Sequence, residues 1–400
     1  RPWWHVLLPL AVVLAGLLAY SNASNGTFVF DDDMWVIRDR DSARRSLVNW
    51  TLDLNRNAAA WNAQRNEPEA RGFLKFNIAV HLAAAAALYG VVRRTLLTAP
   101  LRERFGAYAP WFALAVALLW VVHPLTTQSV MYVIQRAQAL AGMFYLLVFY
   151  GSIRLAEAQS RSPDSPGGWP IRPPLAHLWL ALAVVASCLG MISKGDMVTA
   201  PVLVLLFDRV FLSASWREVF RRRWPLYVGL ALSWLLLVQS GLVGGVLSTG
   251  KRSATVGFSY GGATPFEYLM TQAQVIPHYL KLAVWPQHLC LDYSWPFVRR
   301  ISEVYLEGML LLVALAAAAV GVVRNKPLGF VAAAFFVLLA PTSSFIQIRD
   351  AAFEHRMYLA LAPVLILVAG LVLVFGRELL KRRPMRVGAM IVAVVVATLL

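Results

Sequence analysis

Long apolar runs alternate with short polar segments along almost the whole chain. Several runs reach the length of roughly 20 residues that a helix needs to cross a bilayer. Their spacing predicts about eleven helical spans, the first of them a retained anchor without a cleavage pattern. The apolar runs lie at 6–20, 77–92, 111–122, 139–153, 178–192, 198–212, 224–247, 305–323, 328–345, 358–375 and 387–400.

The composition supports the same structural class. Of the 400 residues, 59% are hydrophobic and 14% are charged, whereas about 25% of the residues in a soluble domain are charged. We therefore predict an all-α polytopic membrane protein. The net charge of +16 could suggest a nucleic-acid partner. The basic residues gather in short segments between apolar runs, however, so no nucleic acid is expected as a partner.

The basic residues also predict the orientation of the chain. If the spans alternate, five segments rich in Lys and Arg fall on one side, which the positive-inside rule makes cytoplasmic together with the N-terminus. These segments are 93–104, 154–172, 209–223, 324–326 and 377–386. The long segments 21–75 and 248–303 then face outward. Residues 264–286 are predicted as an interfacial helix interrupted at Pro277, because an additional span there would invert every later segment.

Every cluster of strongly polar residues outside the basic segments falls on the predicted outer side. Ionisable groups close to lipid are costly and usually line a polar cavity, so this concentration predicts a functional site. The predicted site residues are Asp31, Asp32, Asp33, His123, Arg136, Lys194, Asp196, Asp292, Glu354, His355 and Arg356.

Carboxylates opposite cations suit sugar transfer from a lipid-phosphate donor. A carboxylate takes the proton of the acceptor hydroxyl, and cations stabilise the departing phosphate. Asp31 and Asp32 are the candidates for this base, since crowding or burial can raise the pKa of one carboxylate. The candidate ligands of the donor phosphate are Arg136, Lys194, His355 and Arg356. The remaining predicted residues would line the site.

Most of these residues also have a purely structural interpretation. The aspartates could cap a helix N-terminus, and His123 could mark a helix end before a proline. Lys194 and Asp196 could form an ion pair within a turn. Glu354 and Arg356 could be snorkelling charges at the membrane interface.

Two other classes of function compete with a transferase. A transporter or flippase of a lipid-linked solute would show matched interrupted helices in its two halves, and the sequence has no such pair. A membrane scaffold would not need the clustered charges. Asp31 and Asp33 form a D-x-D pattern of the kind that holds a divalent metal. No further ligand has a matching spacing, so no cofactor is expected.

Several ordered motifs resemble those of the transmembrane and tetratricopeptide-repeat O-mannosyltransferases and their bacterial relatives. "FVFDDD" after the first run is similar to their "FVFDD", and "HPLTTQSVMYVIQRAQ" to their HP…T…V…R segment. "SKGDMVTAPVLVLLFD" and "FEHRMYLAL" resemble two later motifs, although Gly195 and Asp196 stand where the family usually has a Glu after Lys194. The stretch "TQAQVIPHYLKLAVWPQHLCLD" is similar to a further element of the bacterial relatives.

This resemblance implies a GT-C glycosyltransferase fold for residues 1–400, with the active site at the outward, periplasmic face of a bacterial inner membrane. It aligns Asp31 and Asp32 with the family's catalytic aspartate pair. It also implies a polyprenyl-phosphate sugar donor, a protein Ser/Thr acceptor and inversion at the sugar carbon. A lipid or glycan acceptor stays an alternative. Tetratricopeptide repeats are expected as a further periplasmic domain after residue 400.

Overall fold

The computed structural model describes residues 4–32, 70–160, 174–240, 242–247, 256–258, 260–379 and 386. Among these residues the only β-pairing is a single bridge between Val256 and Ile348. Short 3₁₀-helices and one π-helical segment, Asp208–Leu212, join or extend the α-helices. The α-helices are α1 (Trp4–Ala19), α4 (Ala70–Thr95), α5 (Ala99–Phe105), α6 (Ala109–Val122), α7 (Thr127–Met131), α8 (Arg136–Ser160), α9 (Pro174–Met191), α10 (Ala200–Phe207), α11 (Trp216–Gln239), α12 (Leu242–Leu247), α13 (Pro265–Val284), α14 (Tyr305–Val323), α15 (Pro327–Leu339) and α16 (Met357–Leu379).

Five helical segments in the described part of the chain are long and apolar enough to cross a membrane. They are Ala70–Thr95, Ala99–Val122, Val133–Ser160, Tyr305–Val323 and Glu354–Gly376. Shorter apolar helices lie within α1, α9 and α15. The chain is therefore an all-α, membrane-embedded protein, as the sequence predicts. The number of about eleven spans stays a prediction.

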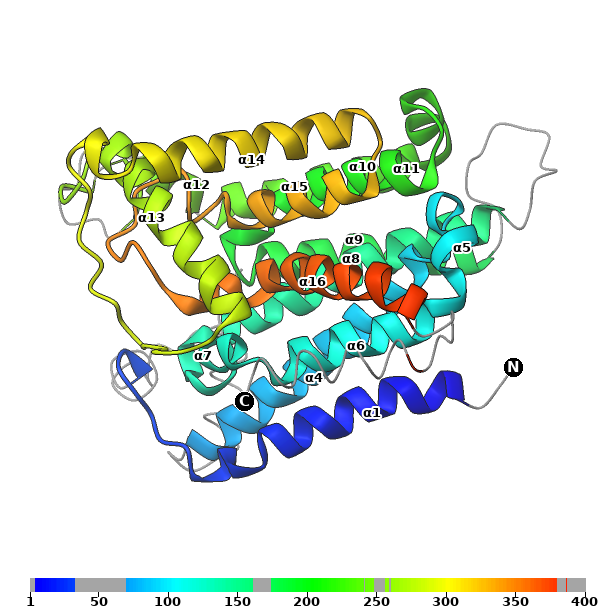
Figure 1. The fold of residues 1–400 in the computed structure, drawn as a ribbon, viewed down its shortest axis with the longest axis horizontal. Coiled ribbons are helices and arrows are strands. Elements are labelled where there is room, and N and C mark those ends of the chain that lie inside the picture. The colour runs from blue at the N-terminus through cyan, green and yellow to red at the C-terminus, as the bar shows by residue number, and fades with distance from the viewer. Residues whose placement is uncertain are drawn as a thin grey trace.

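Most helices run side by side in one bundle, and α13 crosses the bundle at one end (Figure 1). α8 packs against α4 and α9, α4 also contacts α1 and α6, and α15 contacts α14 and α16. We name the two ends of the bundle by their short helices. The α7 end also holds the end of α1 and the beginning of α16, and the α5 end holds the turn between α14 and α15 (Figure 1).

A pair of glycines lets α14 and α15 approach each other closely. A Cβ atom added to Gly321 would lie 2.6 Å from the Cα atom of Gly329, so a side chain there would require a helix to move. Small residues at such contacts are typical of helix packing in membranes. The contact stabilises the hairpin whose turn lies at the α5 end.

The helix bounds correct the sequence analysis in three places. The predicted interruption at Pro277 is wrong, because α13 continues through it. The buried neighbours Ile276 and Tyr279 provide packing that offsets the hydrogen bond lost at a proline. The run 224–247 is divided between α11 and α12, and the run 328–345 is helical only to Leu339. The run 387–400 and most of the segment 21–75 lie outside the described residues.

Candidate active site

The predicted site residues come from segments that meet at the α7 end of the bundle (Figure 1). These segments follow α1, join α6 to α8 and α9 to α10, follow α13 and precede α16. Residues far apart in the sequence are therefore brought together by the alternating direction of the helices. Asp33 lies outside the described residues.

Asp32 is a buried carboxylate that holds two segments together. Its Oδ1 accepts a hydrogen bond from the backbone N–H of Ile134 at 2.8 Å, and its Oδ2 accepts from Val29 at 3.1 Å and Val133 at 3.3 Å. Burial raises the pKa of Asp32, although these hydrogen bonds and the charge of Arg136 oppose the increase. With both oxygens engaged, Asp32 attaches the segment after α1 to the beginning of α8.

Asp31 is only partly buried and faces other acidic groups. Its backbone N–H donates to the hydroxyl of Tyr132 at 3.2 Å. Burial, followed by the charges of Asp292 and Asp31, raises the pKa of Asp350, while nearby arginines lower it. Asp31 and Asp292 therefore each lie within electrostatic reach of Asp350.

Arg356 is a buried cation whose donors are used within the protein. Its Nη1 donates to the carbonyl oxygens of Ala351 at 2.8 Å and Thr342 at 3.1 Å, and to the hydroxyl of Tyr268 at 3.2 Å. Its Nη2 donates to the carbonyl of Asp350. Arg356 thus fixes the backbone next to Asp350, and its direct contact with a phosphate stays a prediction.

Lys194 lies next to Arg356 but keeps more access to solvent. Its Nζ donates to Oε1 of Gln138 and lies 3.7 Å from Oδ2 of Asp196, so the ion pair within the turn is present. Burial lowers the pKa of Lys194, Asp196 opposes this effect, and the charge of Arg356 adds to it. The side chain of Lys194 remains 22% exposed. Lys194 is therefore the most accessible of these cations.

Polar residues next to Arg356 connect α16 to neighbouring segments. Oε1 of Glu354 accepts from the N–H of Cys290 at 2.6 Å and from the hydroxyl of Tyr293 at 2.7 Å. The backbone N–H and Nδ1 of His355 both donate to Oε1 of Gln128, at 2.6 and 3.0 Å. Glu354 and His355 are both buried. They support the site, since Oε1 of Glu354 and Nδ1 of His355 are engaged by protein partners.

Asp292 and Asp196 have local partners. Oδ1 of Asp292 accepts from the N–H of Ser294 at 2.8 Å, a short-range bond typical of turns. Both carboxylates are partly exposed and available to line a solvent-filled site.

Arg136 is enclosed by aromatic rings. Its guanidinium carbon lies 5.1 Å from the ring centroid of Phe73 and 5.3 Å from that of Phe76. Its side-chain nitrogens have no hydrogen-bond partner in the described part of the chain, and the residue is 1% exposed. Its charge favours the ionised form of Asp32. Its contact with a donor phosphate stays a prediction.

His123 is a buried histidine that ends α6. Its Nδ1 accepts from the N–H of Leu125 at 3.2 Å, and its Nε2 lies 3.2 Å from the carbonyl oxygen of Ala283, to which it donates. Burial lowers the pKa of His123 to about 4. The neutral ring therefore joins α6 to α13.

The burial of His123 predicts a loss of stability in acid. Its pKa falls from 6.5 to about 4 on folding, so between these values the unfolded chain binds a proton that the folded chain does not. This contribution is complete above about pH 6.5 and decreases by up to about 1.4 kcal/mol per pH unit toward pH 4. Thermal unfolding in detergent at several pH values measures it. His123→Gln should reduce the decrease of stability between pH 6.5 and pH 4, whereas His288→Gln, at an exposed histidine, should not. An equal decrease in both variants would contradict the role of His123 in this pH dependence.

Four further polar residues belong to this region in addition to those that the sequence patterns predict. Gln128, Tyr132 and Gln138 lie within the segment 123–138, whose resemblance to family motifs was a usable signal. No sequence pattern around Asp350 marks it as a site residue, because the acidic groups near it come from distant segments. Among the described residues, no group of three or more His, Cys, Asp or Glu side chains is arranged to hold a metal ion.

Comparison with known proteins gives one distant relation. The chain is 23% identical over 230 residues to "Protein O-mannosyl-transferase TMTC4" of Mus musculus, which covers 52% of this chain and 29% of that protein. The Homo sapiens protein of the same name is 24% identical over 230 residues, with the same coverage. The chain thus matches less than a third of the length of these relatives. No family model and no solved structure matches the chain.

The chain is therefore distantly related to protein O-mannosyl-transferases, which suggests a glycosyltransferase activity. This agrees with the coarse expectation from the sequence motifs. The donor, the acceptor and the roles of individual residues are proposals.

Proposed function

We propose that the protein is a membrane glycosyltransferase of the GT-C type, which moves a sugar from a polyprenyl-phosphate donor to a Ser or Thr hydroxyl of a protein. The distant relation to protein O-mannosyl-transferases supports the class of activity. The observation that carries the proposal is that the segments with Asp31, Lys194 and Arg356 meet at the α7 end, where partly exposed carboxylates lie close to cations. Nζ of Lys194 lies 3.7 Å from Oδ2 of Asp196, and Arg356 donates to the backbone carbonyl of Asp350.

In this proposal Asp31 is the general base and Asp32 is a positioning residue. Both oxygens of Asp32 accept backbone hydrogen bonds and its side chain is fully buried, so an acceptor hydroxyl has no access to it. Asp31 is partly exposed, and its backbone N–H donates to the hydroxyl of Tyr132. Its carboxylate takes the hydroxyl proton as the acceptor oxygen attacks the anomeric carbon of the sugar.

Lys194 is the proposed contact for the donor phosphate. As the bond between the anomeric carbon and the phosphate oxygen breaks, the lipid phosphate leaves with the electron pair, and a nearby cation stabilises this charge. The charge of Arg356 acts on Lys194 and adds positive potential near it. His355 and Arg136 are buried and support the site without a proposed direct contact with the phosphate. One displacement without a covalent enzyme intermediate inverts the configuration of the sugar carbon.

The distribution of basic residues supports an orientation for this reaction. The α5 end carries exposed cations on α5 and in the turn between α14 and α15, namely Arg102, Arg104, Arg324 and Lys326. The positive-inside rule favours a cytoplasmic α5 end. The α7 end would then face outward, toward the periplasm of a bacterial inner membrane.

Reconstitution tests the activity directly. Purified protein in vesicles is supplied with a radiolabelled polyprenyl-phosphate sugar and a periplasmic protein extract. We expect label in protein that is released by β-elimination, as for a Ser- or Thr-linked sugar. Label that appears only in lipid or glycan would contradict the protein acceptor, and no transfer from any polyprenyl-phosphate sugar would contradict the donor. EDTA is expected to leave the rate unchanged.

Lys194→Met is expected to weaken the use of the donor. Loss of the ammonium group removes a contact that grows stronger as the phosphate leaves, so kcat/KM for the donor should fall by roughly 10–100-fold, in line with about 1.5–3 kcal/mol for a charged hydrogen bond. Initial rates at varied donor concentration measure the change. Lys281→Met, at an exposed lysine of α13, is the control. Equal rates in the two variants would exclude Lys194 as a phosphate contact.

A further inference from the structure

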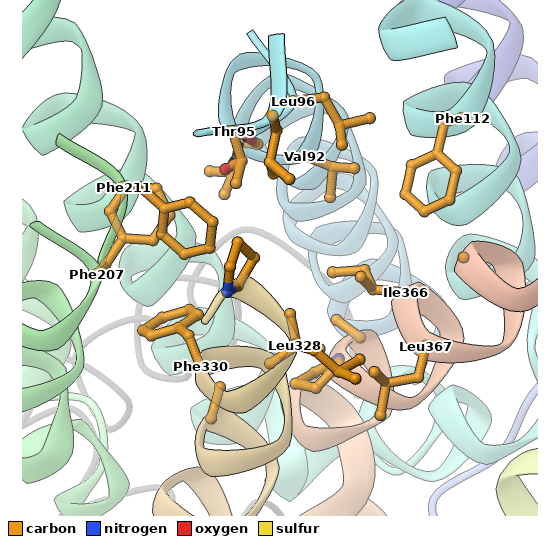
Figure 2. A pocket seen from close by; sticks show the side chains of 18 of the residues that line it. Val92, Thr95, Leu96, Phe112, Phe207, Phe211, Leu328, Phe330, Ile366 and Leu367 are labelled. Carbon is orange, nitrogen blue, oxygen red and sulfur yellow. Dashed lines mark hydrogen bonds between the residues drawn. The ribbon is translucent and has the colours of Figure 1, made fainter. Parts of the chain in front are cut away.

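A cavity of about 630 Å³ lies between α4, α5, α8, α10, α15 and α16. Phe207, Phe330 and Ile366 surround its hollow centre (Figure 2). The volume falls within the roughly 300–1,000 Å³ that small-molecule sites occupy. Along α16 the lining extends from Leu359 to Val374, which is about 22 Å at 1.5 Å per residue. The cavity is therefore long enough to hold an extended chain.

The chemistry of the lining favours a hydrocarbon. Most of the lining side chains are aliphatic or aromatic, and Thr95, Arg104 and Tyr145 are the polar exceptions. Thr95 donates to the carbonyl of Val91 at 2.8 Å, and the hydroxyl of Tyr145 lies 3.1 Å from that of Thr199. A sugar placed here would lose its hydrogen bonds to water without finding new ones.

The cavity opens toward the α5 end and the lipid-facing surface. Leu328 and Leu371 at its edge are 69% and 61% exposed, whereas Leu203 and Leu359, nearer the α7 end, are buried. The guanidinium of Arg104 lies 5.1 Å from the ring of Phe105 at the edge of the cavity. A cationic group therefore stands where the polar end of a lipid would emerge.

We propose that this cavity binds one acyl chain of an anionic phospholipid from the leaflet at the α5 end, with Arg104 contacting the lipid phosphate. Basic pockets between membrane helices are known to bind anionic headgroups. The exposed Lys326, which directly precedes the lining residue Pro327, adds positive charge on the same side. The closed inner end of the cavity argues against the tail of a sugar donor that reacts at Asp31. This lipid site is independent of the proposed transferase activity.

A matched pair of glycine substitutions tests the site. A Cβ atom at Gly370, which lines the cavity, or at Gly308 on α14, which does not, would meet no heavy atom within 4 Å. The side chain of Gly370→Phe should therefore begin in open space and occupy the cavity, while Gly308→Phe adds the same side chain elsewhere. The proteins are equilibrated with vesicles of phosphatidylglycerol and phosphatidylethanolamine, and bound lipid is counted by native mass spectrometry.

We expect retained phosphatidylglycerol in the wild type and in Gly308→Phe, and at least a tenfold loss in Gly370→Phe. Arg104→Gln, a change at an exposed position, should retain lipid but lose the preference for phosphatidylglycerol over phosphatidylethanolamine by about tenfold. Thermal unfolding confirms that each variant is folded. The proposal is overturned if Gly370→Phe retains as much lipid as Gly308→Phe. It is also overturned if the wild type retains no phospholipid or retains only a polyprenyl lipid supplied with the vesicles.

Discussion

Replacement of Asp31 by Asn is expected to abolish sugar transfer and to leave the fold intact. An amide cannot take the proton of the acceptor hydroxyl, and general-base catalysis contributes about 10²–10⁴-fold to a rate. The backbone N–H of Asp31, which donates to Tyr132, is unaffected by the change. The free energy of unfolding should therefore change by no more than about 0.5 kcal/mol. Initial rates in reconstituted vesicles and thermal unfolding of the same preparation measure both effects.

Two neighbouring aspartates serve as controls for Asp31. Asp292→Asn removes a nearby charge without removing the proposed base, so the rate should fall by less than about tenfold. Asp32→Asn would place an amide NH₂ against the backbone N–H groups of Val133 or Ile134, which costs about 1–3 kcal/mol of stability. The loss of activity in Asp32→Asn should equal the fraction of the protein that is unfolded. A folded but inactive Asp32→Asn, together with an active Asp31→Asn, would reverse the two roles.

The contrast between Asp31 and Asp32 shows what sequence patterns can and cannot predict about this site. The pattern locates the acidic cluster beside the first apolar run, and the structure places Asp31 and Asp32 at the α7 end. The pattern cannot distinguish two adjacent carboxylates, because two of the three amides that engage Asp32 lie 101 and 102 residues later in the chain. Burial of one side chain is thus decided by long-range packing rather than by local sequence.

Arg356 and Arg223 illustrate the same limit for cations. The sequence predicts Arg356 as a ligand of the donor phosphate, and Arg223 belongs to the basic segment 209–223. In the structure, Arg356 donates to backbone carbonyls, and Arg223 is paired with Asp208. Charge counts along a chain therefore overestimate the number of free cations, because helix connections bury some of them.

The fold was more predictable than the site for a physical reason. A helix in lipid must satisfy all of its backbone groups internally, so a long apolar run by itself predicts a helix. Each of the five described spans contains one of these runs, and α14 at Tyr305–Val323 matches its run at both ends. The continuity of α13 through Pro277 and the cavity beside α16 depend instead on tertiary packing, which leaves no periodic signal in the sequence.

The largest loss of stability is expected from Asp208→Ala, at the opposite end of α10 from Lys194. Asp208 accepts hydrogen bonds from Nε of Arg223 at 2.5 Å and from Nη2 at 2.6 Å, and Ser213 donates to it at 2.8 Å. The side chains of Asp208 and Arg223 are 2% and 4% exposed. Removing the carboxylate would leave a buried charge without its counter-ion, which costs about 3–5 kcal/mol. Unfolding of the purified protein in a denaturing detergent titration measures the loss.

The ion pair between Arg94 and Glu157 is a matched control, because it is equally short but only partly buried. Its nitrogen–oxygen distance is 2.5 Å, and its side chains are 17% and 30% exposed. Glu157→Ala should therefore cost no more than about 1 kcal/mol, because solvent screens the remaining charge. Adding Arg223→Met to Asp208→Ala removes both buried charges and should recover part of the lost stability.

If Asp208→Ala loses no more stability than Glu157→Ala, solvent must reach Arg223. Because Asp208 does not contact Asp31 or Lys194 in the structure, the folded fraction of each variant should retain its transfer rate per molecule, which separates stability from catalysis.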